Sequence, residues 1–170
     1  METERLRIEP LTEKHAHHLF PIMSDDRIYD YVDEEAISSE TQLTQRYKSL
    51  AKGAPKESNE MWLNWAVKLK LQEQYIGTLQ ATVYATRRAE IAYMFAPEFW
   101  GKGYATEATV RLCEYLFKEI GTVEIGILVD VHNIASIKLA EKLGFSLTKT
   151  VDCTLKGDPA REHHYLLQQN

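Results

Sequence analysis

The sequence is poor in cysteine, in basic residues and in long apolar stretches. Its two cysteines, Cys113 and Cys153, form no CxxC pair and no metal-ligand pattern, which predicts reduced thiols and no bound metal. The 20 Lys and Arg are outnumbered by 25 Asp and Glu, giving a net charge of -5, so a broad basic surface for nucleic acid is not expected. A mildly acidic surface instead favours a cationic partner, such as an amine.

The chain also lacks the segments that target or anchor a protein. No run of about 18 or more apolar residues is present, so no membrane span is expected. The charged N-terminal sequence METERLRIEP has no apolar segment of the kind found in signal peptides. These features predict a cytoplasmic protein without membrane contact. No linker divides the 170 residues, so a single domain spanning 1–170 is expected.

The first 60 residues are predicted to be mainly helical after one short strand at 6–10. Thr12 and Ser39 precede helical segments as N-cap residues. The predicted helices span 13–23, 24–32 and 40–52, and a loop follows at 53–59.

The pattern then changes to three strands: 62–70 alternates, 75–85 contains Thr and Val, and 90–95 is short and apolar. A helix at 104–120, a strand at 123–129, a helix at 134–143 that ends before Gly144, and strands at 145–151 and 161–167 complete the chain. This order predicts an α/β fold of mixed α+β type. The three central strands form an antiparallel meander, and a helical crossover makes 90–95 parallel to 123–129.

The segment FWGKGYATEA at 99–108 follows a strand and opens a helix. Gly101 and Gly103 allow a sharp turn and a close approach of the backbone to a ligand. The N–H groups of the first helical turn lack intrahelical partners and lie at the positive end of the helix dipole, while Lys102 adds a cation. The segment therefore predicts a diphosphate site. A dinucleotide-binding fold is rejected because it requires an N-terminal strand–helix–strand unit and a small residue at Thr106.

A second segment, DVHNIAS at 130–136, leads from a strand into a helix that ends in EKLGF at 141–145. Together with WGKGYATEA, about 30 residues earlier, it closely resembles the GNAT superfamily of N-acetyltransferases, and in particular the RimJ/RimL branch that acetylates N-termini of ribosomal proteins. The resemblance implies a twisted, mostly antiparallel sheet of seven strands, splayed between strands 4 and 5, with about four helices on its faces. It also implies acetyl-CoA as cosubstrate.

The resemblance further implies where acetyl-CoA binds. The turn holds the diphosphate, the end of strand 90–95 pairs with the pantetheine amides, and Asn133 binds the pantetheine arm. The residues expected to contact the cosubstrate are Met94, Phe95, Ala96, Trp100, Gly101, Lys102, Gly103, Tyr104, Ala105, Thr106, Asn133 and Ser136.

Two residues are the catalytic candidates. Glu90 begins the strand that carries the thioester and is the expected general base, directly or through water; the alternative is an exposed residue at a strand start. Ser136 is the only hydroxyl in the 134–143 helix, where related enzymes carry a tyrosine, and is expected to protonate or stabilise the departing thiolate. Both Ser136 and Asn133 are also suited to helix capping. A backbone N–H near Met94 or Phe95 is the expected oxyanion donor.

The amine acceptor is not readable from the sequence. A protein N-terminal α-amine is the first expectation, and a polyamine, an amino acid or an aminoglycoside are alternatives, as is a non-catalytic CoA-binding regulatory module. An acidic patch is expected to steer a cationic amine: Asp25, Asp26, Asp30, Asp33, Glu34 and Glu35. Tyr31, Trp62 and Trp65 are candidates for the acceptor pocket. The sequence does not determine the oligomeric state, for which a homodimer is the candidate.

Overall fold

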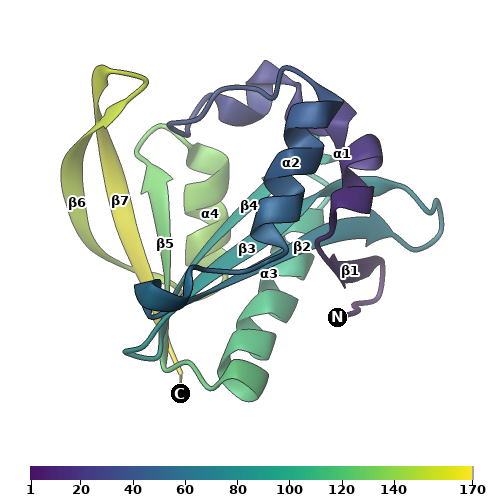
Figure 1. Ribbon diagram of the computed structural model, residues 1–170. Coiled ribbons are helices and arrows are strands. Elements are labelled where there is room, and N and C mark those ends of the chain that lie inside the picture. Colours follow the sequence, from purple (N-terminus) through teal and green to yellow (C-terminus); the bar gives the residue numbers. More distant parts are fainter. Residues whose placement is uncertain (170) are drawn as a thin grey trace.

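The three strands predicted between residues 62 and 95 form the centre of a seven-stranded sheet in the computed structural model, which describes residues 1–169 (Figure 1). Successive side chains of a strand point to opposite faces of the sheet, and helices cover both faces here. The strands are β1 (Leu6–Pro10), β2 (Glu60–Leu69), β3 (Tyr75–Tyr84), β4 (Arg88–Phe95), β5 (Glu124–Asp130), β6 (Ser146–Leu155) and β7 (Asp158–Gln168).

The helices lie in the predicted intervals. The α-helices are α1 (Ala16–Met23), α2 (Glu40–Leu50), α3 (Tyr104–Tyr115) and α4 (Ile134–Lys142). Single turns of 3-10 helix are η1 (Glu13–His15), η2 (Asp26–Tyr29), η3 (Lys56–Ser58) and η4 (Pro97–Phe99), and the π-helical turn η5 (Leu116–Ile120) continues α3. No helix within residues 1–169 is long and apolar enough to cross a membrane.

One predicted helix is wrong. Residues 24–32 form only the single turn η2, because the Asp25 carboxylate accepts a hydrogen bond from the Arg27 N–H at 3.0 Å and the Tyr29 hydroxyl donates to the Met23 carbonyl at 2.9 Å. Both bonds favour a tight turn over a continuous helix. The segment that follows runs as an extended loop to Ser39, which caps α2 through a 3.2 Å bond from the Gln42 N–H.

The strand order is β1-β2-β3-β4-β5-β7-β6. The predicted meander is confirmed, since β2, β3 and β4 are antiparallel neighbours, and β4 pairs in parallel with β5 as expected. The parallel pairing covers three residue pairs and ends at Glu90–Gly126. Beyond that point β5 pairs with β7 alone, so β4 and β5 diverge and the sheet is splayed as the resemblance implied.

The two faces of the sheet carry different helices (Figure 1). One apolar core lies between the sheet and α3 and α4, and it includes Leu79, Ile91, Leu112 and Ile127. A second, smaller core packs α1 and α2 against the opposite face. Side chains of β4 therefore alternate between a face covered by α1 and α2 and a face covered by α3 and α4.

Gly77 on β3 fixes how β3 and β4 meet near the splay. A Cβ atom at this position would lie 2.2 Å from the Met94 carbonyl oxygen and 2.9 Å from the Phe95 ring, so only glycine fits. The close approach holds the final residues of β4 against β3 on one side, while their other edge has no strand partner.

Candidate functional site

The free edge of β4 is the first component of the site. The Ala96 N–H donates to the Ile76 carbonyl on the β3 side at 2.9 Å, whereas the Arg87 carbonyl accepts from the Val123 N–H on the β5 side at 2.8 Å. Because these directions alternate along a strand, the backbone groups of Tyr93 and Phe95 face the gap between β4 and β5. The Phe95 carbonyl accepts a bond from the Trp100 indole at 2.7 Å, which leaves the Phe95 N–H as a donor at the gap.

The turn before α3 has the geometry that its glycines predicted. Gly101 and Gly103 have φ angles of 72° and 80°, a region that L side chains rarely adopt. A Cβ atom at Gly101 would have no neighbour within 4 Å, so this side of the turn is open. The Glu107 N–H is the first in α3 to bond a helical carbonyl, that of Gly103, at 3.0 Å. The preceding N–H groups form a donor cluster at the open side.

A second cation stands beside this turn, and the sequence analysis missed it. Arg5, from the segment before β1, donates to the Lys102 carbonyl at 3.0 Å and lies 4.4 Å above the Tyr104 ring centre. Its Nε bonds the Glu107 carboxylate at 2.6 Å. Burial alone would raise the pKa of Glu107, but bonds from Thr3 and Arg5 outweigh burial and hold that pKa below its ordinary value.

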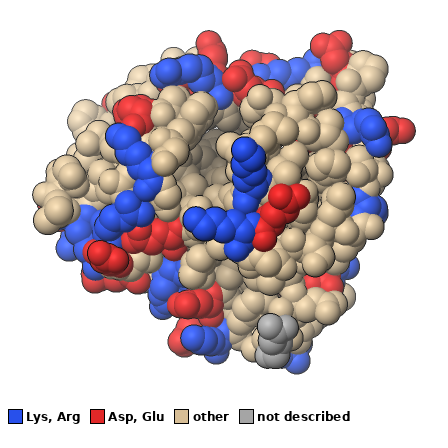
Figure 2. All heavy atoms as spheres, turned by 180° about the vertical axis from the view of Figure 1, so that it is seen from behind, with Lys and Arg blue, Asp and Glu red and all other residues tan. Residues whose placement is uncertain are grey.

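Figure 2 shows the molecule from behind, on the face that carries α3 and α4. This face is hollowed near its middle, and Lys and Arg side chains border the hollow. Cations beside a cluster of free N–H groups are the chemistry that binds a diphosphate.

The start of α4 brings Asn133, Ser136 and Tyr93 together. The Asn133 side-chain oxygen accepts a bond from the Ser136 N–H at 3.1 Å, so Asn133 is the N-cap of α4 and its amide NH₂ remains as a donor. The Ser136 side chain lies next to the Tyr93 hydroxyl, which is buried and has no hydrogen bond within residues 1–169. Burial raises the pKa of Tyr93, and Ser136 partly opposes this shift.

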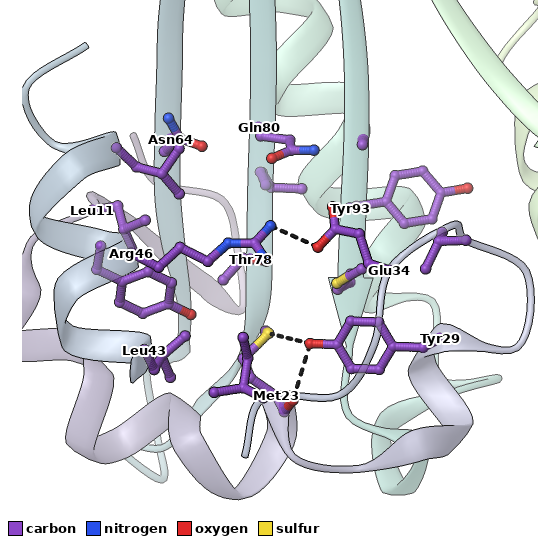
Figure 3. A pocket seen from close by; sticks show the side chains of 17 residues that line it. Leu11, Met23, Tyr29, Glu34, Leu43, Arg46, Asn64, Thr78, Gln80 and Tyr93 are labelled. Atoms are coloured by element: carbon purple, nitrogen blue, oxygen red, sulfur yellow. Dashed lines mark hydrogen bonds and ion pairs between the residues drawn. The ribbon is translucent and has the colours of Figure 1, made fainter. Parts of the chain in front are cut away.

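Tyr93 is a residue that the sequence analysis did not select. The Tyr93 ring points away from the β3 side of β4 (Figure 3). Its position in an apolar strand gave no signal, because only the pairing of β4 and the placing of α4 show that its hydroxyl lies beside Ser136.

Glu90 is exposed and is the last β4 residue that pairs with β5, rather than the first residue of the strand. Its carboxylate accepts a bond from the Tyr84 hydroxyl at 3.1 Å. Burial and the neighbouring Glu90 carboxylate raise the pKa of Tyr84. Glu90 thus lies at the fork where β4 and β5 separate, on the order of 10 Å along the strand from Tyr93 at about 3.3 Å per residue.

A cavity of about 120 Å³ lies between α2 and the face of β2, β3 and β4, next to the free end of β4 (Figure 3). Arg46 reaches from α2 across the cavity and pairs with Glu34, with 2.7 Å between Nη2 and Oε2. The other polar lining residues are Tyr29, Tyr47, Asn64, Thr78, Gln80 and Tyr93.

The aromatic residues predicted for an acceptor pocket are not in this cavity. Trp65 is buried on the α3 face against Tyr115, with ring centres 5.8 Å apart, and the Trp62 indole bonds Glu60 at 2.8 Å. Tyr31 is exposed and does not line the cavity. The cavity instead uses polar residues of β2 and β3, because alternation turns Trp65 to the opposite face.

The acidic patch is only partly free. Asp25 pairs with Arg27, Glu34 with Arg46, and the Asp33 carboxylate accepts a bond from the Lys156 N–H at 2.7 Å. Asp33 thus ties the loop before α2 to the turn between β6 and β7. Within residues 1–169, no group of three or more His, Cys, Asp or Glu side chains is placed to hold a metal ion.

The sequence and the fold match known proteins over most of the chain. A family model described as an acetyltransferase (GNAT) domain matches residues 5–146. An uncharacterized N-acetyltransferase of Bacillus subtilis, YoaA, is 30% identical over 147 residues, which are 85% of this chain and 81% of that protein.

Solved structures share the fold at lower identity. An acetyltransferase of the GNAT family from Bacillus anthracis superposes with a TM-score of 0.85 at 22% identity, over 99% of this chain and 97% of that one. A ribosomal-protein-S5-alanine acetyltransferase from Vibrio fischeri has a TM-score of 0.84 at 17% identity, over 99% and 95%. A spermidine N-acetyltransferase from Vibrio cholerae, solved with CoA and spermine, has a TM-score of 0.83 at 22% identity, over 98% and 97%.

Proposed function

Because this chain belongs to the GNAT acetyltransferase family, we propose that it transfers the acetyl group of acetyl-CoA to the primary amine of a protein N-terminus. The observation that supports this most directly is the gap beyond Glu90–Gly126, where the free edge of β4 faces the start of α4 and adjoins the open turn before α3. This arrangement offers donors to a diphosphate at one end and to an amide-bearing arm along β4.

The residues present fit acetyl-CoA. The turn is open at Gly101, a Cβ atom at Gly103 would lie 3.5 Å from Nη2 of Arg5, and Lys102 and Arg5 carry positive charge beside the turn. The backbone groups of Tyr93 and the N–H of Phe95 have no strand partner within residues 1–169, and the Asn133 amide adds a donor from α4. When bound, acetyl-CoA supplies the reactive thioester.

Acetyl transfer forms a C–N bond, breaks the C–S bond, and moves one proton from the amine to the departing thiolate. The Phe95 N–H is placed to stabilise the carbonyl oxygen as negative charge develops on it. Ser136 and the unpaired hydroxyl of Tyr93 lie together at the start of α4 and serve the thiolate. Glu90 accepts the amine proton through water rather than directly. It lies on the order of 10 Å along β4 from Tyr93, beside which the thiolate departs.

A protein N-terminal α-amine suits this site because its pKa, about 7.7–8.0, is low enough for a base acting through water. The fold shared with the Vibrio fischeri acetyltransferase is in accord with this acceptor. A polyamine is the second candidate. It is favoured by the acidic residues near the loop before α2 that have no ion pair within residues 1–169, Asp26, Asp30 and Glu35, and by the Vibrio cholerae neighbour.

A thiol-release assay over matched amines tests the proposal. The panel comprises a peptide with a free N-terminus, the same peptide N-terminally blocked but carrying one lysine, spermidine, and an aminoglycoside. We expect release of CoA with the free N-terminal peptide and mass-spectrometric addition of one acetyl group to its α-amine. Tight binding of acetyl-CoA without thiol release for any amine would instead identify a regulatory CoA-binding module.

A further inference from the structure

The cavity under α2 has an unusual charge balance for a site that receives an amine. Among the residues that line it, Glu34 and Arg46 are the charged ones, and they pair with each other at 2.7 Å (Figure 3). The lining is therefore formally neutral. A cation with two or three charges needs more than one carboxylate to offset its loss of hydration in such a cavity. The cavity does not offer that charge to a polyamine.

Arg46 presents more donors than Glu34 uses. A guanidinium carries five N–H donors in a planar fork, and a bidentate pair with one carboxylate engages two of them; the closest contact to Glu34 is from Nη2 to Oε2. Arg46 lines the cavity and its side chain is about two-fifths exposed, so its remaining donors are accessible to a ligand. Planar forks of this kind bind carboxylate and carbonyl oxygens with defined geometry.

A buried hydroxyl adds to this donor set. Tyr47 lines the same cavity, and its hydroxyl is buried and has no hydrogen bond within residues 1–169. A buried donor without a partner destabilises the fold, and such a group in a native protein calls for an explanation such as a bound ligand. Tyr47 follows Arg46 directly on α2, so one helix brings both donors to the cavity.

We propose that this cavity binds the carbonyl or carboxylate oxygen of an α-aminoacyl acceptor, with Arg46 as the residue that recognises it. The inference rests on the proposed function and names the group by which its acceptor is recognised, an oxygen two bonds from the carbon that carries the amine. Ala92 and Met94 of β4 line the same cavity. An acceptor held by Arg46 therefore directs its amine toward the strand that borders the gap.

Free amino acids and peptide N-termini share this chemistry, whereas simple amines and polyamines lack the oxygen. The experiment compares L-alanine, an alanyl peptide, ethylamine and spermidine as acceptors, with kcat/KM expressed per unprotonated amine. The variants are Arg46→Met, which keeps the apolar stem, and Arg46→Lys, which keeps the charge but loses the fork. Arg27→Met is the matched control, because Arg27 pairs with Asp25 outside the cavity.

We expect the parent to prefer alanine or the alanyl peptide over ethylamine, and Arg46→Met to lose about tenfold to a hundredfold in kcat/KM with that aminoacyl acceptor alone. The range corresponds to the loss of a hydrogen bond to a charged group. Arg46→Lys should show a smaller loss confined to the same acceptor, which keeps the test valid if Arg46→Met unfolds. The ratio of alanine to alanyl peptide identifies the source of the group.

Two results would overturn the inference. One is a parent that uses ethylamine or spermidine as well as the aminoacyl acceptors. The other is an equal loss for all four amines in both Arg46 variants, which would assign Arg46 to holding the loop at Glu34. Failure of the proposed function is distinct from both, since no amine would then release thiol from acetyl-CoA.

Discussion

At the residue scale, the hydroxyls of Ser136 and Tyr93 are the two groups proposed to stabilise or protonate the departing thiolate. Ser136 contributes its N–H to the cap of α4 through Asn133, so its hydroxyl is left free for chemistry. The neighbouring Tyr93 hydroxyl is buried without a bond within residues 1–169, which is unfavourable unless a bound group completes it. If the Tyr93 hydroxyl serves function rather than stability, its removal should lower activity without lowering stability.

We therefore expect Tyr93→Phe to lower kcat while leaving the melting temperature unchanged or raised, because the variant removes an unpaired buried polar group.

Ser136→Ala should lower kcat by about 10²–10⁴-fold with little change in the acceptor KM. If both hydroxyls serve one proton transfer, the fold-decrease in kcat of the double variant should be smaller than the product of the fold-decreases of the two single variants. Steady-state kinetics and thermal unfolding provide the readouts. Wild-type kcat in Ser136→Ala would leave Ser136 with its capping contact only.

Glu90 makes a separate residue-scale prediction. If Glu90 accepts the amine proton, Glu90→Gln should reduce kcat/KM most near neutral pH, and the defect should shrink as free amine appears at higher pH. A lysine-type amine should suffer more than an α-amine, because its pKa is about two units higher. Rates between pH 6 and 10 with both amine types test this.

Glu124→Gln is the control for Glu90, since Glu124 lies at the start of β5, beside the same fork, and pairs with Arg88 at 2.5 Å. A parent-to-variant ratio for Glu90→Gln that stays constant with pH would refute the base role and leave the acetyltransferase assignment intact.

At the element scale, the turn before α3 is the binding device. Both glycines have positive φ, and a Cβ atom would meet open space at Gly101 and Nη2 of Arg5, at 3.5 Å, at Gly103. The helix therefore begins with donors facing outward, beside a cation. Gly103→Asp places both a side chain and a negative charge at that point. We expect acetyl-CoA affinity to fall by at least about tenfold, or 1.4 kcal/mol, in isothermal titration calorimetry.

Gly53→Asp separates backbone strain from loss of the site. Gly53 has a φ of 79°, close to the 80° of Gly103, but it follows α2 rather than preceding α3. A Cβ atom at Gly53 would have no neighbour within 4 Å, whereas one at Gly103 would lie 3.5 Å from Nη2 of Arg5. The control should lose comparable stability and keep acetyl-CoA affinity. If the folded Gly103→Asp protein bound acetyl-CoA as tightly as the parent, the assignment of the diphosphate to this turn would be wrong.

At the scale of the whole molecule, Arg5 joins the N-terminal segment to α3 across 102 positions of sequence through its bond to Glu107. The pKa of Glu107 is below its ordinary value of 4.5 in the fold. A carboxyl with a depressed folded pKa stabilises the protein above its unfolded pKa, and this stabilisation is lost as pH falls through the folded value. The difference in unfolding free energy between the parent and Glu107→Gln should thus be largest above about pH 5 and shrink below pH 4.5.

Urea unfolding from pH 3 to 7 measures that difference. Glu57→Gln, an exposed carboxyl on η3, is the control and should show no comparable trend. Arg5→Met should reproduce the loss of stability at neutral pH and should also weaken acetyl-CoA binding, because Arg5 lies beside the diphosphate turn. A pH-independent difference for Glu107→Gln would contradict the depressed pKa.

The sequence by itself determined the elements of the sheet and the turn before α3, because these depend on short-range rules. The alternation that predicted β2 follows from the two-residue period of a strand. Gly101 and Gly103 define the turn through their backbone freedom, and Ser39 and Asn133 cap helices through bonds three residues away. The one helix predicted wrongly, at 24–32, failed because side-chain bonds of Asp25 and Tyr29 favour a tight turn.

The tertiary structure alone decided which side chains share the site. Tyr93 and Ser136 are 43 positions apart, and they meet because β4 loses β5 after Glu90 and α4 begins beside the opening. Arg5 reaches the α3 turn because the segment before β1 runs past it, and Glu34 reaches Arg46 from the loop between η2 and α2. Contacts between distant segments depend on how whole elements pack, and no local pattern of residues encodes that arrangement.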